Sequence, residues 1–467
     1  MPYSNELMSI RKNTASELKK ILGFDRNLTY DKYKDSAFES ENIYAQINKI
    51  VYHSKNFYIS GDLFTDSLIE YDEYYFNEQQ RLPRPVVCFF ETRIPLKAII
   101  EPKDYLSETL KKELQDQINI VSTEGSDKHD IKIETNIEQK LDQMTDELYN
   151  NLLLISLSDR RDGYRSRIYF SASPFRQNIT YIKFVCQTDN HVPLTLPTLS
   201  ELNSNDVTSI LNSIEPQILN VYNVGQGNFT ELIDNKGFQR KIVFDPGITC
   251  TKSHNPYDLA IKEYGQLNAD CFFISHFDTD HFLGIIYLKD DQFQSNKLWI
   301  APDPTSIKKL STSARRIIWF LHNNAKFRII KDSTSYYTFN KKIKVFRGTA
   351  DPKSVTDNGK YINGSGIMIS VEGKRKTALL TGDCLYEYWN KDVPEECDYL
   401  VVPHHGCKVD AVKIEGKQTD RSEAIISVGN GNSYGHPNSQ HIKKLLDKGF
   451  NSVLLTKNIT LKVYDLD

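Results

Sequence analysis

Six consecutive residues constrain this chain more than any other feature. His276-Phe-Asp278-Thr-Asp280-His281 follows the apolar run 271–275, which predicts a buried strand, and apolar residues resume directly after it. Two imidazoles and two carboxylates at a strand end are costly to desolvate unless something neutralises them. Imidazole nitrogen and carboxylate oxygen are ligands for divalent zinc, manganese or iron. The cluster therefore predicts a metal site, and the alternative is a solvated polar loop.

Composition bounds the protein class without choosing a function. At 467 residues, with 39% hydrophobic and 25% charged residues, the chain suits a soluble protein of two or three domains. No apolar run approaches the roughly 18 residues of a membrane span, and no secretion signal is recognisable, so no membrane partner is expected. The seven cysteines show no paired spacing, which favours the cytoplasm. The formal charge of −3 gives no global case for nucleic-acid binding. Frequent Lys and Asn hint at a bacterial genome rich in A and T.

A stretch rich in turn-forming residues divides the chain. Residues 187–215 contain Pro, Asn, Asp and Ser in high density, which is typical of a linker. We expect a separate N-terminal α+β domain over 1–200, a linker over 201–215 and a second domain over 216–467. The first domain shows no grouping of residues with metal-ligand spacing. Its role stays open, and binding of a protein partner is the default hypothesis.

Local patterns place elements in both regions. In the N-terminal region we expect helices at 6–22, 104–119 and 136–155, and strands at 86–90 and 179–185. In the C-terminal region short β-branched runs alternate with helical stretches, which predicts an α/β fold of sheets covered by helices. The strands are expected at 218–221, 241–244, 270–274, 297–300, 344–346, 367–371 and 378–380, and the helices at 256–265, 306–324 and 438–448.

Further polar residues follow other apolar runs of the C-terminal region. Asp245 ends one run, where it is either a turn-forming carboxylate or part of a site. Asp383 follows a second run, His404 and His405 follow a third, and His436 lies in a later polar loop. This distribution of histidines at strand ends is hard to explain by chance.

The turn Gly225-Gln226-Gly227 follows the first expected strand of this region. Two glycines around Gln226 allow a bound group to approach the backbone, and successive N–H groups can hold an anion. A simple turn is an equally good interpretation, so we treat these residues as candidate substrate contacts.

Six motifs in order resemble those of the metallo-β-lactamase superfamily. Within it, the match is to the branch that resembles the soluble metallohydrolase domain of the competence protein ComEC. The resemblance covers about 216–467 and implies a metallo-β-lactamase-like four-layer αβ/βα sandwich with two metal positions at one edge. It extends to the tail, where 452–456 and 459–463 resemble the closing strand pair of that domain. The motifs are Val-Gly-Gln-Gly-Asn, Phe-Asp-Pro-Gly, Ser-His-x-Asp-x-Asp-His, Leu-Thr-Gly-Asp, His-His-Gly and Tyr-Gly-His-Pro.

The resemblance implies ligands for both metal positions. His276 and Asp278 would serve the first position, Asp280 and His281 the second, and Asp383 would bridge them.

One of the two adjacent histidines would complete the second position. His405, beside the glycine, is favoured over His404, and the choice stays open. Asp245, with His404, would lie behind the ligands, where Asp245 orients the histidines through hydrogen bonds. His436 would face the substrate or approach the metals.

Two departures from the family pattern bear on the metals. Asp278 stands where many members have His, and the usual separate His before the bridging Asp has no counterpart. His322 lies in a predicted helix and is not expected to replace it. The first position is therefore expected to be the weaker one, completed by water or His436. A carboxylate-rich site favours Mn²⁺, with Zn²⁺ close behind.

The expected activity is hydrolysis by a metal-activated hydroxide, with Asp280 holding the water or moving its proton. Such a centre and the resemblance favour a phosphodiesterase or nuclease acting on DNA. Lys408 is placed to meet a phosphate, although Cys407 stands where the family pattern has a small hydroxyl residue. The alternatives are hydrolysis of a small ester, thioester or cyclic nucleotide, and a partner-binding protein with a silent metal site.

Overall fold

The computed structural model divides the chain into two compact units. One comprises Met1–Thr195 with Ser311–Arg316, and the other comprises Leu196–Leu310 with Ile317–Asp467. The structure describes residues 43–53, 56–65, 88–95, 121–122, 131–132, 152–158, 164–170, 178–187, 195–203, 206, 211–234, 241–248, 262–331, 336–339, 341–355, 357–417, 421–430 and 435–467.

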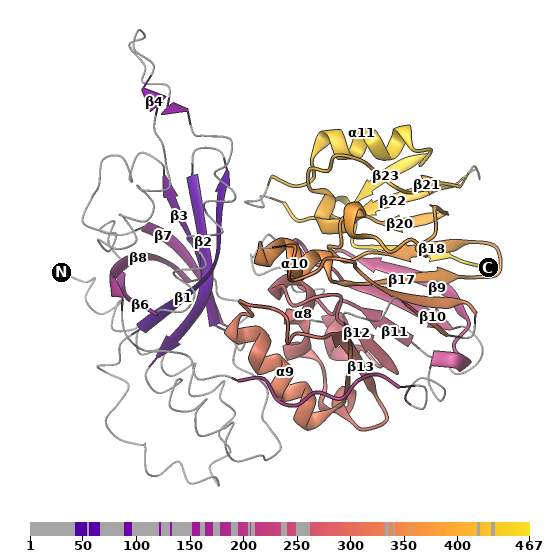
Figure 1. Ribbon diagram of the computed structural model, residues 1–467, viewed down its shortest axis with the longest axis horizontal. Helices are drawn as coiled ribbons and strands as arrows, with labels where there is room; N and C mark the ends of the chain where they lie inside the picture. The colour runs from indigo at the N-terminus through magenta and orange to yellow at the C-terminus, as the bar shows by residue number, and fades with distance from the viewer. Residues whose placement is uncertain are drawn as a thin grey trace. The chain divides into compact units, whose positions relative to one another are not determined.

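The first unit contains a closed barrel of six antiparallel strands (Figure 1). Alternate side chains such as Phe57, Ile59 and Ile182 are buried, as expected where one face of each strand lines a core. In barrel order the strands are β1 (Ile43–His53), β2 (Asn56–Thr65), β3 (Cys88–Pro95), β7 (Tyr164–Phe170), β8 (Asn178–Gln187) and β6 (Leu153–Ser158), and β4 (Val121–Ser122) pairs with β5 (Ile131–Lys132) as a separate ribbon.

The expected helices of this unit fall mostly outside the described residues. The helices at 6–22 and 104–119 lie wholly outside them, as does 136–150 of the third. The end of that third helix is wrong, because residues 153–155 are extended in β6. These residues pair with both β1 and β8, so the ladder that closes the barrel outweighs the local helical pattern.

The second unit is a mixed α/β structure built on two seven-stranded sheets (Figure 1). In sheet order the first has β14 (Lys326–Ile330), β13 (Leu298–Pro302), β12 (Cys271–Phe273), β11 (Lys241–Phe244), β10 (Thr230–Asp234), β9 (Pro216–Tyr222) and β24 (Leu461–Asp465). The second has β15 (Tyr336–Phe339), β16 (Ile343–Arg347), β17 (Ile367–Glu372), β18 (Thr377–Leu380), β20 (Tyr399–Val401), β22 (Glu423–Ile426) and β23 (Ser452–Leu455).

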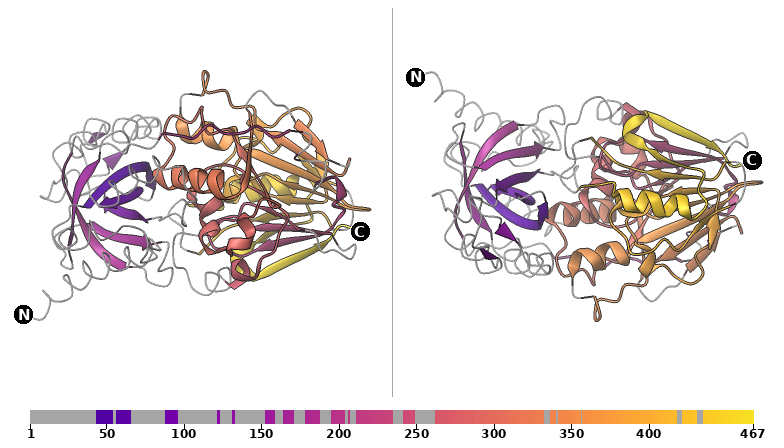
Figure 2. Two further views of the ribbon diagram at one scale, coloured as in Figure 1. Left: turned by 90° about the horizontal axis from the view of Figure 1, so that it is seen from below. Right: turned by 90° about the horizontal axis from the view of Figure 1, so that it is seen from above.

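Side chains from both sheets form one apolar core between them. In β12, Cys271 and Phe273 belong to this core, whereas Phe272 faces the other way and stacks on Trp299. The outer face of the second sheet packs against α11 (Ser439–Asp447), whose Leu445 shares a cluster with residues of β20 and β22 (Figure 2). The core thus holds the strand ends of both sheets at fixed positions.

Most expected elements of this unit form, with shifted bounds. The helix expected at 306–324 is α9 (Thr312–Asn324), because Asp303 accepts a hydrogen bond from the Thr305 N–H and the chain first makes turns. The two closing strands form as β23 and β24, but they join different sheets. Of the helix expected at 256–265, the described part is helical. No helix in the described part of the chain is long and apolar enough to cross a membrane.

Candidate metal centre

Strands of both sheets deliver the candidate residues to one edge. β11 and β12 run parallel, as do β18, β20 and β22, so their carboxyl ends meet. His276 lies three residues beyond β12, and the short helix α8 (Thr279–Phe282) then carries Asp280 and His281. A hydrogen bond from the Ile367 N–H to the Ser275 carbonyl, 2.8 Å long, ties this loop to the second sheet.

The turn after β18 places Asp383 against that loop. Gly382 has a φ of +52°, and a Cβ added there would lie 2.5 Å from the Ser275 hydroxyl oxygen. Only glycine combines this backbone with so close an approach. Asp383 is therefore fixed by the contact between two turns, one from each sheet.

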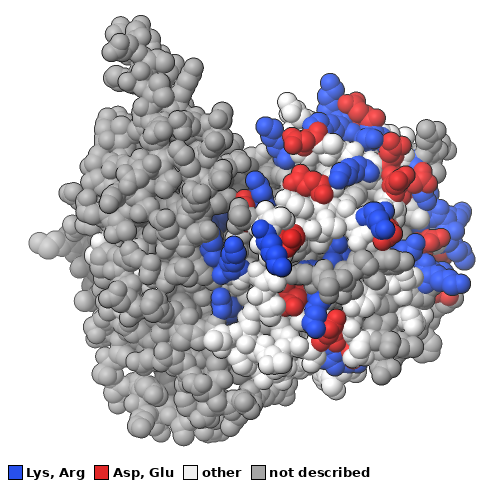
Figure 3. Space-filling model, viewed as in Figure 1, with Lys and Arg blue, Asp and Glu red and all other residues white. Residues whose placement is uncertain are grey.

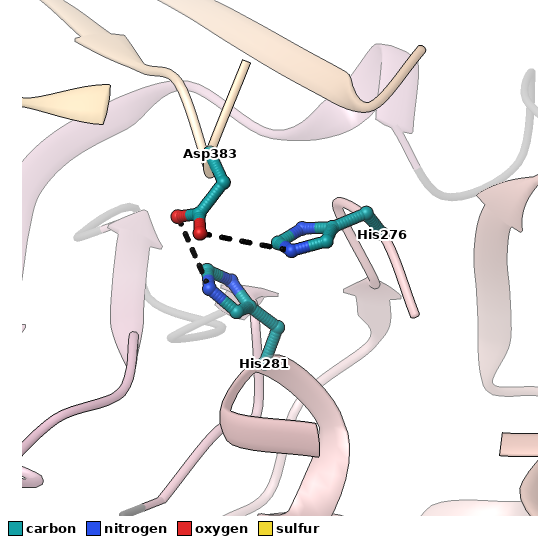
Figure 4. A group of neighbouring side chains, drawn as sticks. All are labelled: His276, His281 and Asp383. Carbon is teal, nitrogen blue, oxygen red and sulfur yellow. Dashed lines mark ion pairs between the residues drawn. The ribbon is translucent and has the colours of Figure 1, made fainter. Parts of the chain in front are cut away.

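Asp383 lies at the centre of four imidazoles. Its Oδ1 is 3.2 Å from Nε2 of His281 and 3.7 Å from Nε2 of His405. Its Oδ2 is 3.8 Å from Nε2 of His276 and 3.8 Å from Nε2 of His404. Figure 4 shows the rings of His276 and His281 with their ring nitrogens directed at this carboxylate.

The two other carboxylates of the cluster each face one imidazole. Asp278 Oδ2 lies 3.7 Å from Nε2 of His276, and Asp280 Oδ2 lies 3.3 Å from Nε2 of His405. Two groups of three ligand atoms each have all members within 4.8 Å of one another: His276, His281 and Asp383, and Asp280, His281 and His405. The sequence-predicted ligands are thus brought together.

Hydrogen bonds behind the rings fix their orientation. Asp245, fully buried, accepts the Ser275 N–H at 2.6 Å and lies 2.8 Å from Nδ1 of His281. Nδ1 of His405 donates to the Ser427 carbonyl at 2.7 Å, and Nδ1 of His276 lies 2.9 Å from the Ser275 hydroxyl oxygen. A protonated Nδ1 leaves Nε2 with a lone pair for a cation.

The convergent atoms fit a divalent cation. Nε2 of His276, His281 and His405 and Oδ1 of Asp383 are all buried and form no hydrogen bond. Buried polar atoms without a partner are costly, and here four of them surround one point. Nitrogen and carboxylate oxygen together suit Zn²⁺ or Mn²⁺.

The charges of the residues themselves point to a missing positive charge. Burial opposes protonation of His281, but the carboxylates of Asp383 and Asp245 outweigh it and raise its pKa well above the usual value. Burial likewise opposes ionisation of Asp383, but His281 and His405 outweigh it and hold its pKa well below the usual value. The carboxylates thus favour positive charge among the imidazoles, and a bound cation would supply it.

The glycine turn supports α8 and uses one of its donors internally. The Asn228 N–H donates to the Asp280 carbonyl at 3.3 Å, and Gly227 backs onto that same carbonyl. The Gly225 N–H donates to the Asn223 side chain at 3.1 Å. Gln226 is buried, and its Oε1 has no hydrogen-bond partner.

The remaining candidates differ in their distance from the centre. The ring of His436 lies 5.5 Å from that of His404, between centroids. Lys408 is exposed just beyond the buried Cys407. His322 is exposed on α9 with its ring edge-on to Trp319, so it is not brought to the centre.

Several partners of the ligands were not singled out from the sequence. Ser275 directly precedes His276, and that adjacency was the available signal. Ser427 acts through its backbone carbonyl, and Asn363 lies 3.4 Å from Nδ1 of His404 across the fold, so neither left a recognisable pattern. His441, buried between the Tyr386 hydroxyl and the Cys407 carbonyl, steadies the turn after the histidine pair.

Comparisons with protein-family models and with curated proteins gave no match. Among solved structures, the chain is similar to a candidate metallo-beta-lactamase from Thermotoga maritima (15% identity, 36% of this chain and 79% of that chain, TM-score 0.24). It is also similar to a candidate metal-dependent hydrolase from Parabacteroides distasonis (13%, 51% and 93%, TM-score 0.29). A third is a candidate zinc-dependent hydrolase of the metallo-beta-lactamase superfamily from Thermotoga maritima (15%, 51% and 98%, TM-score 0.23). Likeness at this level does not assign the chain to a family.

Proposed function

We propose that this protein is a metal-dependent hydrolase and that its preferred substrates are phosphodiesters, DNA among them. One observation carries the proposal: buried, unpartnered Nε2 atoms of three histidines converge on Asp383. The order of the sequence motifs supports the same conclusion. The two sheets and their outer helices suit the four-layer αβ/βα sandwich that we propose for the second unit.

The residues that would hold two cations surround the Asp383 carboxylate. A bound divalent cation supplies Lewis-acid activation of water and of a substrate oxygen. Asp383 would contribute one oxygen to each position, and the remaining ligands would be the histidines and carboxylates of the 276–281 cluster with His405. We rank Mn²⁺ ahead of Zn²⁺ because carboxylates form much of the set.

Two residues on the open side are suited to move protons. The side chain of Asp280 is 26% exposed, whereas that of Asp383 is 3% exposed, so Asp280 is the carboxylate that can meet a substrate water. His405 and His281 lower its pKa despite burial, which keeps the carboxylate ionised. His436, half-buried beside His404, is placed to donate a hydrogen bond to a leaving group.

The substrate class follows from the ligands more than from the surface. Paired cations on a carboxylate-rich site suit in-line displacement at phosphorus. Exposed Lys408 could meet a further phosphate. On the face seen in Figure 3, the described basic and acidic side chains are interspersed and form no basic track. That mixture favours a small phosphodiester as the second candidate substrate.

Location and partners are part of the same proposal. Cys271, Cys384, Cys397 and Cys407 are free and buried, which supports a reducing, cytoplasmic setting. For the barrel unit we propose binding of a protein partner that selects or delivers substrate.

The activity is tested with metal-loaded protein on single- and double-stranded DNA and on bis(p-nitrophenyl) phosphate. We expect Mn²⁺-stimulated turnover that falls about 100-fold or more in Asp280→Asn and Asp383→Asn. Asp447→Asn, which changes an exposed carboxylate on α11, is the matched control and should keep full activity. If the protein hydrolyses bis(p-nitrophenyl) phosphate but cleaves no DNA, the second candidate, a small phosphodiester substrate, is favoured. A protein that carries metal and hydrolyses no phosphodiester would contradict the proposal.

A further inference from the structure

We propose that His404 and His405 both bind metal, each at a different position, with His404 completing the first. This inference rests on the proposed metal function and changes the ligand set that the motifs imply. The sequence motifs imply that only one histidine of the pair binds metal. They leave the first metal position without one of its ligands. Three independent features of the structure carry the inference.

The first feature is how the Asp383 carboxylate divides its neighbours. Its Oδ1 faces His281 and His405, at 3.2 and 3.7 Å from their Nε2 atoms. Its Oδ2 faces His276 and His404, both at 3.8 Å. Two imidazoles therefore face each oxygen of the Asp383 carboxylate. His404 faces Oδ2 in the same way that His405 faces Oδ1.

The second feature is the partner of the far ring nitrogen. In His276, His281 and His405, Nδ1 has a polar partner behind the ring and Nε2 points at the carboxylate. His404 also has a polar group behind its ring, because its Nδ1 lies 3.4 Å from Nδ2 of the Asn363 amide.

The Asn363 amide suits this role when its oxygen faces the ring. Asn363 is buried and its Oδ1 has no hydrogen-bond partner. Rotating the amide by half a turn exchanges oxygen and nitrogen, so that Oδ1 accepts from a protonated Nδ1. That tautomer leaves Nε2 of His404 with its lone pair directed at Asp383.

The third feature is the backbone of the pair. His404 and His405 both adopt left-handed conformations, with φ of 49° and 52°. Such residues are strained and persist where the surroundings enforce them. In an extended chain, neighbouring side chains point to opposite faces. Here the turn brings both rings to one carboxylate, with their planes at 76°.

The resulting ligand sets have the same composition. Each position receives one histidine and one aspartate from the 276–281 cluster, one oxygen of Asp383 and one histidine of the pair. His404 thereby replaces the separate histidine that this chain lacks. The first position is then not expected to bind its metal more weakly than the second. The first set is His276, Asp278, Asp383 Oδ2 and His404, and the second is Asp280, His281, Asp383 Oδ1 and His405.

Metal content, measured apart from activity, tests the assignment. Full-length protein is loaded with Mn²⁺, dialysed and subjected to elemental analysis, and the coupling between cations is followed by electron paramagnetic resonance. The variants are His404→Asn, His405→Asn and, as the matched control, His436→Asn. Asparagine tolerates the left-handed backbone, so the turn is kept while the imidazole is removed.

We expect wild type and His436→Asn to hold two coupled cations. His404→Asn and His405→Asn should each weaken one cation about 10- to 100-fold and lose the coupled signal. Asn363→Leu should weaken the same cation as His404→Asn, about tenfold, and Asn363→Asp should retain it. These two variants test the proposal again should a histidine variant not fold.

Two coupled cations of wild-type affinity in His404→Asn would overturn the inference, as would loss of one cation in His436→Asn alone. Failure of the proposed function would give a different result. The metal content would follow the pattern above, but the wild-type protein would hydrolyse no phosphodiester.

Discussion

At the scale of single residues, the centre sets buried carboxylates against imidazoles whose protonated forms they favour. Asp383 and Asp280 raise the pKa of His405 although burial opposes its protonation. The pKa of His281 is raised further. Each proton must leave before Nε2 can coordinate a cation.

Metal affinity should therefore depend on pH in a fixed direction. The raised pKa values of His281 and His405 favour protonated rings in the metal-free protein, so metal binding should release protons. Apparent affinity is expected to rise as pH increases through these raised values and to fall below them. Calorimetric titration with Mn²⁺ in two buffers of different ionisation enthalpy would measure the protons released. Affinity independent of pH, with no proton release, would contradict the account.

Residues with their own chemistry could be found in the sequence, and residues that act through the fold could not. His276 and Asp280 stand in one short motif, so local spacing already predicts a shared site. Asn363 and Ser427 reach the centre from other elements, and Ser427 does so through a carbonyl that every residue possesses. No pattern of side chains in the sequence could therefore predict that contact.

At the scale of elements, the site depends on a contact between two turns. The Gly382 turn after β18 lies against Ser275 after β12, and it sets the position of Asp383. Gly382→Ala should cost about 1–3 kcal/mol of unfolding free energy and weaken metal binding, because the Cβ meets the serine hydroxyl and the backbone is left-handed. Denaturant unfolding and a metal competition assay would measure both.

Gly265→Ala is the control for that substitution, since a Cβ there meets nothing within 4 Å. It should leave both quantities unchanged within error. A Gly382→Ala protein with wild-type metal affinity would show that the two turns are not coupled.

Elements were predictable where the local pattern and the packing agree. β11 and β17 follow from β-branched runs, and α11 follows from its apolar spacing. Residues 153–155 were mistaken for the end of a helix because barrel pairing is a long-range effect. The partners of β23 and β24 were equally hidden, since sheet membership is decided by tertiary contacts.

At the scale of the whole molecule, cations would join the two sheets of the second unit. The ligands come from loops after β12 on one sheet and after β18 and β20 on the other. Binding to the folded state alone stabilises it by about 2.7 kcal/mol when free metal is 100-fold above its Kd. Hydrogen exchange at Phe272–Phe273 and Leu379–Leu380 should slow on metal addition and recover with chelator. Equal exchange with and without metal would exclude such a link.

The pairing of β9 with β24 imposes an order on how the centre can assemble. Asn223, in the turn beside α8, donates its amide to the Ile459 carbonyl across 236 positions of the chain. Contacts so distant in sequence form slowly, because a long loop must close first. The pocket cannot be complete while the strand near residue 461 is unsynthesised or unpaired. Metal binding would then be a late event in biogenesis. It would stabilise a fold that has already formed and would not nucleate folding.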